Sequence, residues 1–122
     1  MLKSILLIVF SILLLLLNSC VQPLAPEENT GNNNPPEINS FISERLVIRV
    51  GQTSELWVEA TDPDGDALTY EWFVLLGDII GDGSNVLYSA AYCCAGINKI
   101  TVTVKDSRGA SVSKNIDINV DP

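Results

Sequence analysis

Apolar and polar residues alternate along most of the chain from residue 37 onward, and this alternation predicts β-strands. In the run at residues 53–61, for example, Leu56 and Val58 fall on the same side of an extended chain. Similar runs cover residues 45–50, 67–74, 100–105 and 111–120, and Gly, Pro or Asp separates one run from the next. A period of two with turn residues between the runs is typical of strands with one buried face. The pattern therefore predicts an all-β fold, an antiparallel β-sandwich of about seven strands.

The first twenty residues follow a different pattern, which predicts a secretory signal. Lys3 precedes residues 5–17, which are apolar except for Ser11. A helix of this length rises about 20 Å, whereas the hydrocarbon core of a bilayer is roughly 30 Å thick. The run therefore fits the apolar core of a signal peptide better than a permanent membrane span.

The end of this segment, Leu17-Asn18-Ser19-Cys20, resembles the lipobox of bacterial lipoproteins. The resemblance implies that a signal peptide (residues 1–19) is removed and that Cys20 carries acyl chains. One acyl chain holds a protein to a bilayer only marginally, whereas two or three hold it stably. The residue after the cysteine, Val21, is not Asp, which in a two-membrane cell implies the outer membrane or the cell surface. A signal peptide cut elsewhere and an uncleaved anchor are the alternatives.

Residues 20–36 predict a flexible tether between this anchor and the domain. Residues 21–36 contain four prolines and four asparagines, with few residues that a core would bury. Such a composition behaves as a disordered or extended spacer. The domain is therefore expected to cover residues 37–122.

Charge and composition exclude several classes of function. The chain has 7 basic and 15 acidic side chains, a net charge of −8 and no histidine. Nucleic-acid binding needs clustered Lys and Arg, so we expect no nucleic-acid partner. Histidine is the commonest general base and metal ligand, and without it Ser-His-Asp, Cys-His and HExxH chemistries are excluded.

Three segments together resemble a PKD-type or cadherin-like immunoglobulin-fold module. They are NPP at residues 34–36, TDPDGDALTYEW at 61–72 and ITVTVKDSRG at 100–109. The resemblance spans residues 34–120. It implies an immunoglobulin-like sandwich of the kind that bacterial surface and secreted proteins use as a spacer, an adhesion unit or an accessory binding domain.

The DPDGD segment places Asp62, Asp64 and Asp66 within five residues. One interpretation is structural, because Asp, Pro and Gly at these positions suit a type I turn in which the Asp62 side chain caps the amides. The other is a weak calcium site, since hard divalent cations bind several oxygens. In cadherin-like modules calcium also uses linker oxygens, which here points to Asn33, Asn34 and Asp106.

Cys93 and Cys94 are the only thiols left if Cys20 is acylated. Adjacent cysteines form a disulfide only with distortion of the peptide between them. A strained vicinal disulfide and buried free thiols remain open. Redox catalysis prefers a CxxC spacing and a cationic neighbour, which this pair does not have.

Trp57 has the opposite parity to Leu56 and Val58, so we expect it on the outer face of its strand. With Tyr88 on a neighbouring strand it would form an aromatic platform for sugar or peptide recognition. The alternative is an aromatic side chain partly covered by a loop. Phe73 should face outward on the other sheet.

Asp78 and Asp82 flank a Gly-rich loop at residues 77–83, in which Ile79 and Ile80 are expected to be exposed. Paired carboxylates suggest glycoside hydrolysis, but a small sandwich provides no evident cleft. We therefore expect a lipid-anchored, non-enzymatic module that needs no cofactor and binds an extracellular protein or carbohydrate. The alternative is an accessory hydrolase using Asp78 and Asp82, or a redox protein using the two adjacent cysteines.

Overall fold

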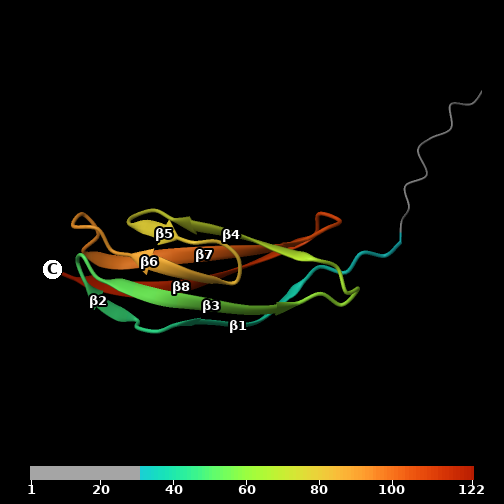
Figure 1. The fold of residues 1–122 in the computed structure, drawn as a ribbon, viewed down its shortest axis with the longest axis horizontal. Coiled ribbons are helices and arrows are strands. Elements are labelled where there is room, and N and C mark those ends of the chain that lie inside the picture. Colours follow the sequence, from blue (N-terminus) through green and yellow to red (C-terminus); the bar gives the residue numbers. More distant parts are fainter. Residues whose placement is uncertain (1–30) are drawn as a thin grey trace, which may run out of the picture. The chain divides into compact units, whose positions relative to one another are not determined.

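The computed structural model describes residues 31–122, which form two stacked β-sheets and no helix (Figure 1). The strands are β1 (Glu37–Ser43), β2 (Val47–Arg49), β3 (Thr53–Thr61), β4 (Leu68–Val74), β5 (Asp78–Ile80), β6 (Asn85–Ser89), β7 (Gly96–Asp106) and β8 (Ser111–Asp121). The first sheet has the order β1-β3-β6-β5 and the second β2-β8-β7-β4. The all-β sandwich is therefore confirmed; β2 lies inside the run predicted at residues 45–50, whereas β5, with only three residues, is a strand that alternation cannot reveal.

Pairing within the sheets is antiparallel except between β2 and β8, which run parallel. The longest ladder joins β7 and β8, from the Gly96–Val120 pair to the Lys105–Ser111 pair. These two strands are the central pair of the second sheet, and each of them has eleven residues.

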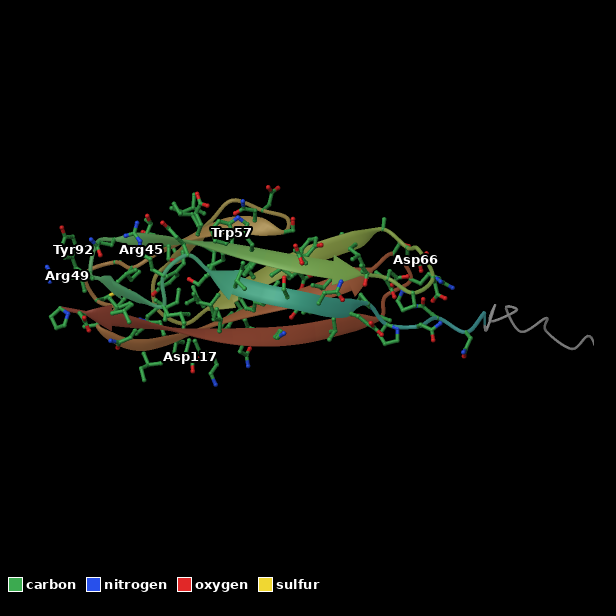
Figure 2. All side chains as sticks on the ribbon, turned by 90° about the horizontal axis from the view of Figure 1, so that it is seen from below. Arg45, Arg49, Trp57, Asp66, Tyr92 and Asp117 are labelled. Atoms are coloured by element: carbon green, nitrogen blue, oxygen red, sulfur yellow. The ribbon has the colours of Figure 1, made fainter. Side chains whose placement is uncertain are left out.

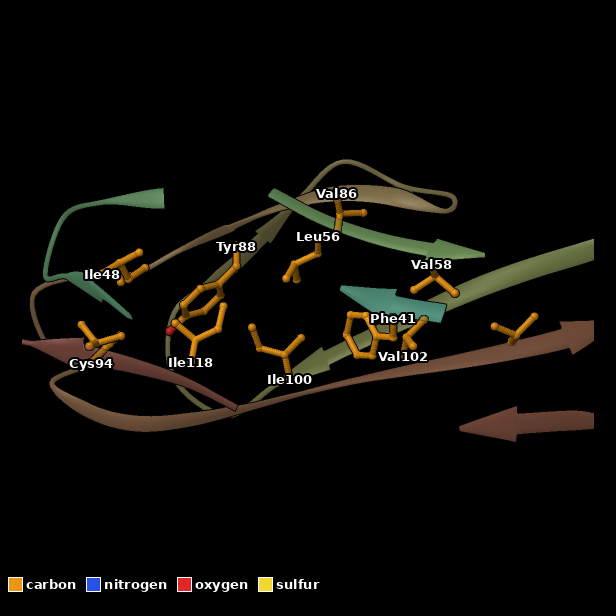
Figure 3. Packing of buried hydrophobic residues seen from close by; sticks show 13 residues of the cluster. Phe41, Ile48, Leu56, Val58, Val86, Tyr88, Cys94, Ile100, Val102 and Ile118 are labelled. Carbon is orange, nitrogen blue, oxygen red and sulfur yellow. The ribbon is translucent and has the colours of Figure 1, made fainter. Parts of the chain in front are cut away.

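The core lies between the facing surfaces of the two sheets (Figure 3). Leu56 of β3 and Ile100 of β7 are both fully buried, as the alternation predicts. Burying a side chain of this size contributes about 1.5–3 kcal/mol. Trp72 of β4 also packs against the core, and its ring meets that of Phe41 edge-on with centroids 5.6 Å apart.

The first strand starts at residue 37, and residues just before it also contact the sandwich. Asn33 and Asn34 are hydrogen-bonded to the domain, and Pro36 is fully buried. They meet the pole formed by the β3–β4 and β7–β8 turns, which we call the N-terminal pole. The β6–β7 turn and Pro122 lie at the other end, the C-terminal pole (Figure 1).

The predicted signal peptide, Cys20 and the tether up to residue 30 lie outside the described residues. Within residues 31–122, no helix is long and apolar enough to cross a membrane.

Candidate functional site

The acidic turn between β3 and β4 is built around the side chain of Asp62. Its Oδ1 atom accepts hydrogen bonds from the backbone N–H groups of Asp64 at 2.9 Å and Asp66 at 3.1 Å. The N–H of Gly65 donates to the carbonyl of Asp62 at 3.1 Å and closes the turn. Gly65 has a φ of +77°, a left-handed conformation that favours glycine. The capping role predicted for Asp62 is confirmed.

Asp106, the last residue of β7, lies at the same pole. Its Oδ1 atom accepts the N–H groups of Arg108 at 2.8 Å and Ala110 at 2.9 Å, and its Oδ2 atom accepts Nδ2 of Asn33 at 2.9 Å. Burial raises the pKa of Asp106, but these hydrogen bonds outweigh it and hold the pKa below the ordinary 3.8. A buried, ionised carboxylate therefore lies beside the acidic turn.

Arg108 supplies the cation of this pole, a residue that sequence analysis did not identify. Its Nε donates to Asp66 Oδ2 at 2.6 Å, and its Nη2 lies 3.1 Å from Asp64 Oδ2. The hydrogen bond to Asp66 raises the pKa of Arg108. Hydrogen bonds from the backbone N–H and side chain of Asn34, together with Arg108, lower the pKa of Asp64. The only local signal for Arg108 is its place in the turn that follows Asp106.

Three carboxylates of the N-terminal pole lie close enough together to hold a metal ion. Asp62, Asp66 and Asp106 each bring one oxygen to a group in which all these atoms lie within 4.8 Å. Among the described residues, Asp62 Oδ2 and Asn33 Oδ1 are buried and have no hydrogen-bond partner. A buried acceptor without a partner destabilises the fold, and a hard cation satisfies such oxygens. The three carboxylates could therefore hold a calcium ion, and Asn33, whose Nδ2 is bonded to Asp106, is the nearest further source of an oxygen; Asp64 lies outside the group.

The aromatic platform predicted for Trp57 and Tyr88 does not form. Tyr88 is fully buried, its hydroxyl donates to the carbonyl of Leu76 at 3.1 Å, and burial raises its pKa to about 12. Trp57 is half-buried on the outer face of the first sheet, as expected, and pairs with Asn85. Because side chains alternate along a strand, Leu87 of β6 shares the face of Trp57, and Tyr88 does not.

An apolar groove of about 300 Å³ lies on the outer face of the second sheet, near the C-terminal pole. Phe73 of β4, Ile97 of β7 and the leucines of the β4–β5 turn, Leu75 and Leu76, form its apolar lining. Leu75 is 81% exposed and Ile97 75% exposed. Lys99 stands in the lining, and none of the ion pairs within residues 31–122 includes it. The outward position expected for Phe73 is confirmed, but its neighbours in the groove were not predicted.

The segment at residues 77–83 is not the open loop that the glycines suggest. Asp78 begins β5 and pairs with Ser89, and Ile79 packs against the core, so only Ile80 of the two isoleucines is exposed. Asp78 and Asp82 are both exposed, and neither lines the groove. The two carboxylates therefore do not belong to this groove.

The sequence model of the bacterial Ig domain family matches residues 33–119. The chain belongs to this family. The match covers both sheets and begins at Asn33, which agrees with the boundary that the hydrogen bonds of Asn33 and Asn34 define. No curated protein matches this bacterial Ig domain.

Two solved structures resemble this bacterial Ig domain. The PKD1 domain of Vibrio anguillarum Epp aligns with a TM-score of 0.55 and 22% identity, over 73% of this chain and 96% of that domain. A nucleoside hydrolase-related hypothetical protein from Saccharophagus degradans, associated with carbohydrate metabolism, aligns with a TM-score of 0.60 and 22% identity, over 72% of this chain. The alignment spans only 26% of that protein. At this identity the likeness shows the fold alone, and the expected immunoglobulin-like sandwich is confirmed.

Proposed function

We propose that this bacterial Ig domain is anchored by acyl chains at Cys20 and acts outside the cell as a non-catalytic binding or structural module. The lipobox-like sequence and the proline- and asparagine-rich segment after it support the anchor. The protein then resides in the bacterial cell envelope, at the outer membrane or the cell surface. Membership of the bacterial Ig family and the likeness to a PKD domain are consistent with an extracellular structural or adhesion module.

The groove on the second sheet is the observation that carries the binding role. Soluble proteins seldom expose a contiguous group of large apolar side chains without a partner. Ile97 lies at one end of β7 and Asp106 at the other, and nine residues of strand span about 30 Å. A partner in the groove therefore stays well clear of the chain that emerges at the N-terminal pole.

A protein partner with an apolar segment and an adjacent carboxylate fits this groove best. Phe73, Leu75 and Ile97 would bury aliphatic or aromatic side chains, whereas sugars are usually bound by stacking on aromatic rings beside several hydrogen-bonding groups. Lys99 stands at the apolar lining of a domain whose net charge is negative. It would attract an acidic partner locally and orient it in the groove.

Binding is tested with the full-length chain in detergent against arrays of extracellular proteins and, separately, of glycans. Ile97→Ser should weaken binding to a protein about tenfold or more, the loss expected for a central apolar contact. Ile80→Ser is the matched control, because Ile80 is also an exposed strand isoleucine but lies on the other sheet. Lys99→Glu should weaken binding to the protein by a similar factor, because it reverses the charge beside the groove. Equal effects of the two serine variants, or binding to glycans alone, would contradict the proposal.

Hydrolysis is the competing function, and it is tested directly. Asp78→Ala combined with Asp82→Ala removes the only carboxylate pair suggested for it. The wild-type chain should show no turnover on a glycan panel, whereas activity that this double variant abolishes would make the protein a hydrolase.

We further propose that calcium binds at the N-terminal pole, through Asp62, Asp66, Asp106 and Asn33. The two buried oxygens without a partner support this proposal. Calcium would supply the positive charge that Arg108 provides only in part. Because Asn33 precedes the first strand, the ion would also fix the direction in which the chain enters the sandwich.

A further inference from the structure

The two adjacent cysteines lie in the turn between β6 and β7, and the turn holds them in different environments. The N–H of Cys94 donates to the carbonyl of Ala91 at 3.0 Å, and the buried Nδ2 of Asn98 donates to the carbonyl of Cys94 at 2.6 Å. The Cys94 side chain is fully buried and belongs to the hydrophobic cluster drawn in Figure 3. Cys93 is exposed. Cys94 is therefore fixed, and Cys93 is accessible from solvent.

The two Sγ atoms lie 3.4 Å apart. A disulfide bond is about 2.05 Å long, so closure needs a movement of about 1.4 Å. The Cys93 side chain can make this movement because it is exposed and belongs to a turn outside the sheets. The Cα atoms of adjacent residues are about 3.8 Å apart, less than the usual span of a disulfide. The bond would therefore be strained and easily reduced.

We propose that Cys93 and Cys94 form a reversible vicinal disulfide by exchange with an external disulfide. The Cys93 thiolate attacks one sulfur of the donor, a mixed disulfide forms, and the other donor sulfur leaves as a thiolate. The Cys94 thiolate then attacks Sγ of Cys93 and releases the second donor thiolate. In total the two protein thiols lose two protons and two electrons, and the donor disulfide is reduced to two thiols.

The short distance between the two sulfur atoms favours the vicinal disulfide over a mixed disulfide or a link between two chains. An exposed thiol in an oxidising compartment forms mixed disulfides or links two chains, but Cys94 lies in contact distance and resolves the mixed disulfide first. Burial raises the pKa of the Cys94 thiol, so the resolving step should become faster as the pH rises. Closure would also fix the turn that carries Tyr92, which is 88% exposed at the C-terminal pole (Figure 2).

Formation of the Cys93–Cys94 disulfide in the cell depends on the export proposed above. The following test in solution does not depend on export. The full-length Cys20→Ser chain in detergent, whose only thiols are Cys93 and Cys94, is incubated with oxidised glutathione. The intact mass should fall by two hydrogen atoms, with no bound glutathione and no alkylation by N-ethylmaleimide. Reduced glutathione should restore both alkylation sites. A stable glutathione adduct, a covalent dimer or two reactive thiols would overturn the proposal, and none of these results bears on export.

Single variants separate the two steps. In Cys94→Ala the first step remains, so Cys93 should keep one glutathione. In Cys93→Ala the buried Cys94 should stay unmodified. In the wild-type turn, amide exchange at residues 91–95 should slow on oxidation, and Cys93→Ala should show no such change. A Cys94→Ala chain that takes up no glutathione, or a Cys93→Ala chain that takes it up readily, would contradict the proposed order of attack.

Discussion

Calcium bound at the N-terminal pole should raise the free energy of unfolding of the domain, and the expected affinity sets the size of this effect. Three carboxylates and one amide supply the oxygens, and Arg108 already neutralises part of the charge. We therefore expect an affinity at the weak end of extracellular modules, about 1 mM. With about 10 mM calcium, this affinity stabilises the folded state by about 1.4 kcal/mol. For a domain of this size the melting temperature should rise by about 6–11 °C.

The measurement is thermal unfolding of the full-length chain in detergent, with calcium compared against sodium chloride of equal ionic strength. Asp62→Asn is the decisive variant, because an asparagine Oδ1 can still cap the turn while the unpartnered carboxylate oxygen is lost. It should fold and show no calcium response. Asp117→Asn, at an exposed site on β8, should respond as the wild type does. Arg108→Gln should respond more strongly, because it removes the competing cation. A wild-type midpoint that calcium leaves unchanged, or an equal rise in Asp62→Asn, would refute the site.

Other substitutions test the core, the anchor and the ionised carboxylates. Tyr88→Ala should lower the free energy of unfolding by about 3–5 kcal/mol, and Trp57→Ala by much less; equal losses in urea unfolding would contradict the burial of Tyr88. Cys20→Ser should move the protein from the membrane to the soluble fraction, whereas retention with an intact amino terminus would mean that residues 5–17 remain as an anchor. The folded pKa values of Asp64 and Asp106 lie below 3.8, so their stabilisation is present above that pH and is lost as the pH falls further. The free energy of unfolding should therefore drop between about pH 5 and about pH 2, less steeply in Asp64→Asn, and a flat profile would exclude this contribution.

The strands that the sequence reveals are those long enough to show a period of two. β3, β7 and β8 each have nine or more residues and one buried face, so alternation identifies both the strand and its inward side. β2 was found because it lies inside the longer run at residues 45–50, whereas β5 has only three positions, too few to show a period. Ile79 of β5 faces the core because β5 pairs with β6. This pairing is a tertiary contact that the sequence around Ile79 does not indicate.

The functional surfaces were less predictable because they depend on register and on contacts between distant residues. Trp57 faces outward as its parity indicates, but its pairing with Asn85 decides that Tyr88 points inward. If the register between β3 and β6 were shifted by one residue, Tyr88 would lie on the outer face with Trp57. Arg108 reaches Asp66 across 42 residues. The groove likewise joins the end of β4 to the start of β7, which no single window of sequence brings together.

The intact mass of the mature protein, extracted from bacterial membranes, tests the central claim most directly. The account predicts a chain that begins at Cys20 and carries the additional mass of two or three acyl chains. A chain that begins at Met1, or one that begins at Cys20 with an unmodified thiol, would contradict a lipid-anchored module.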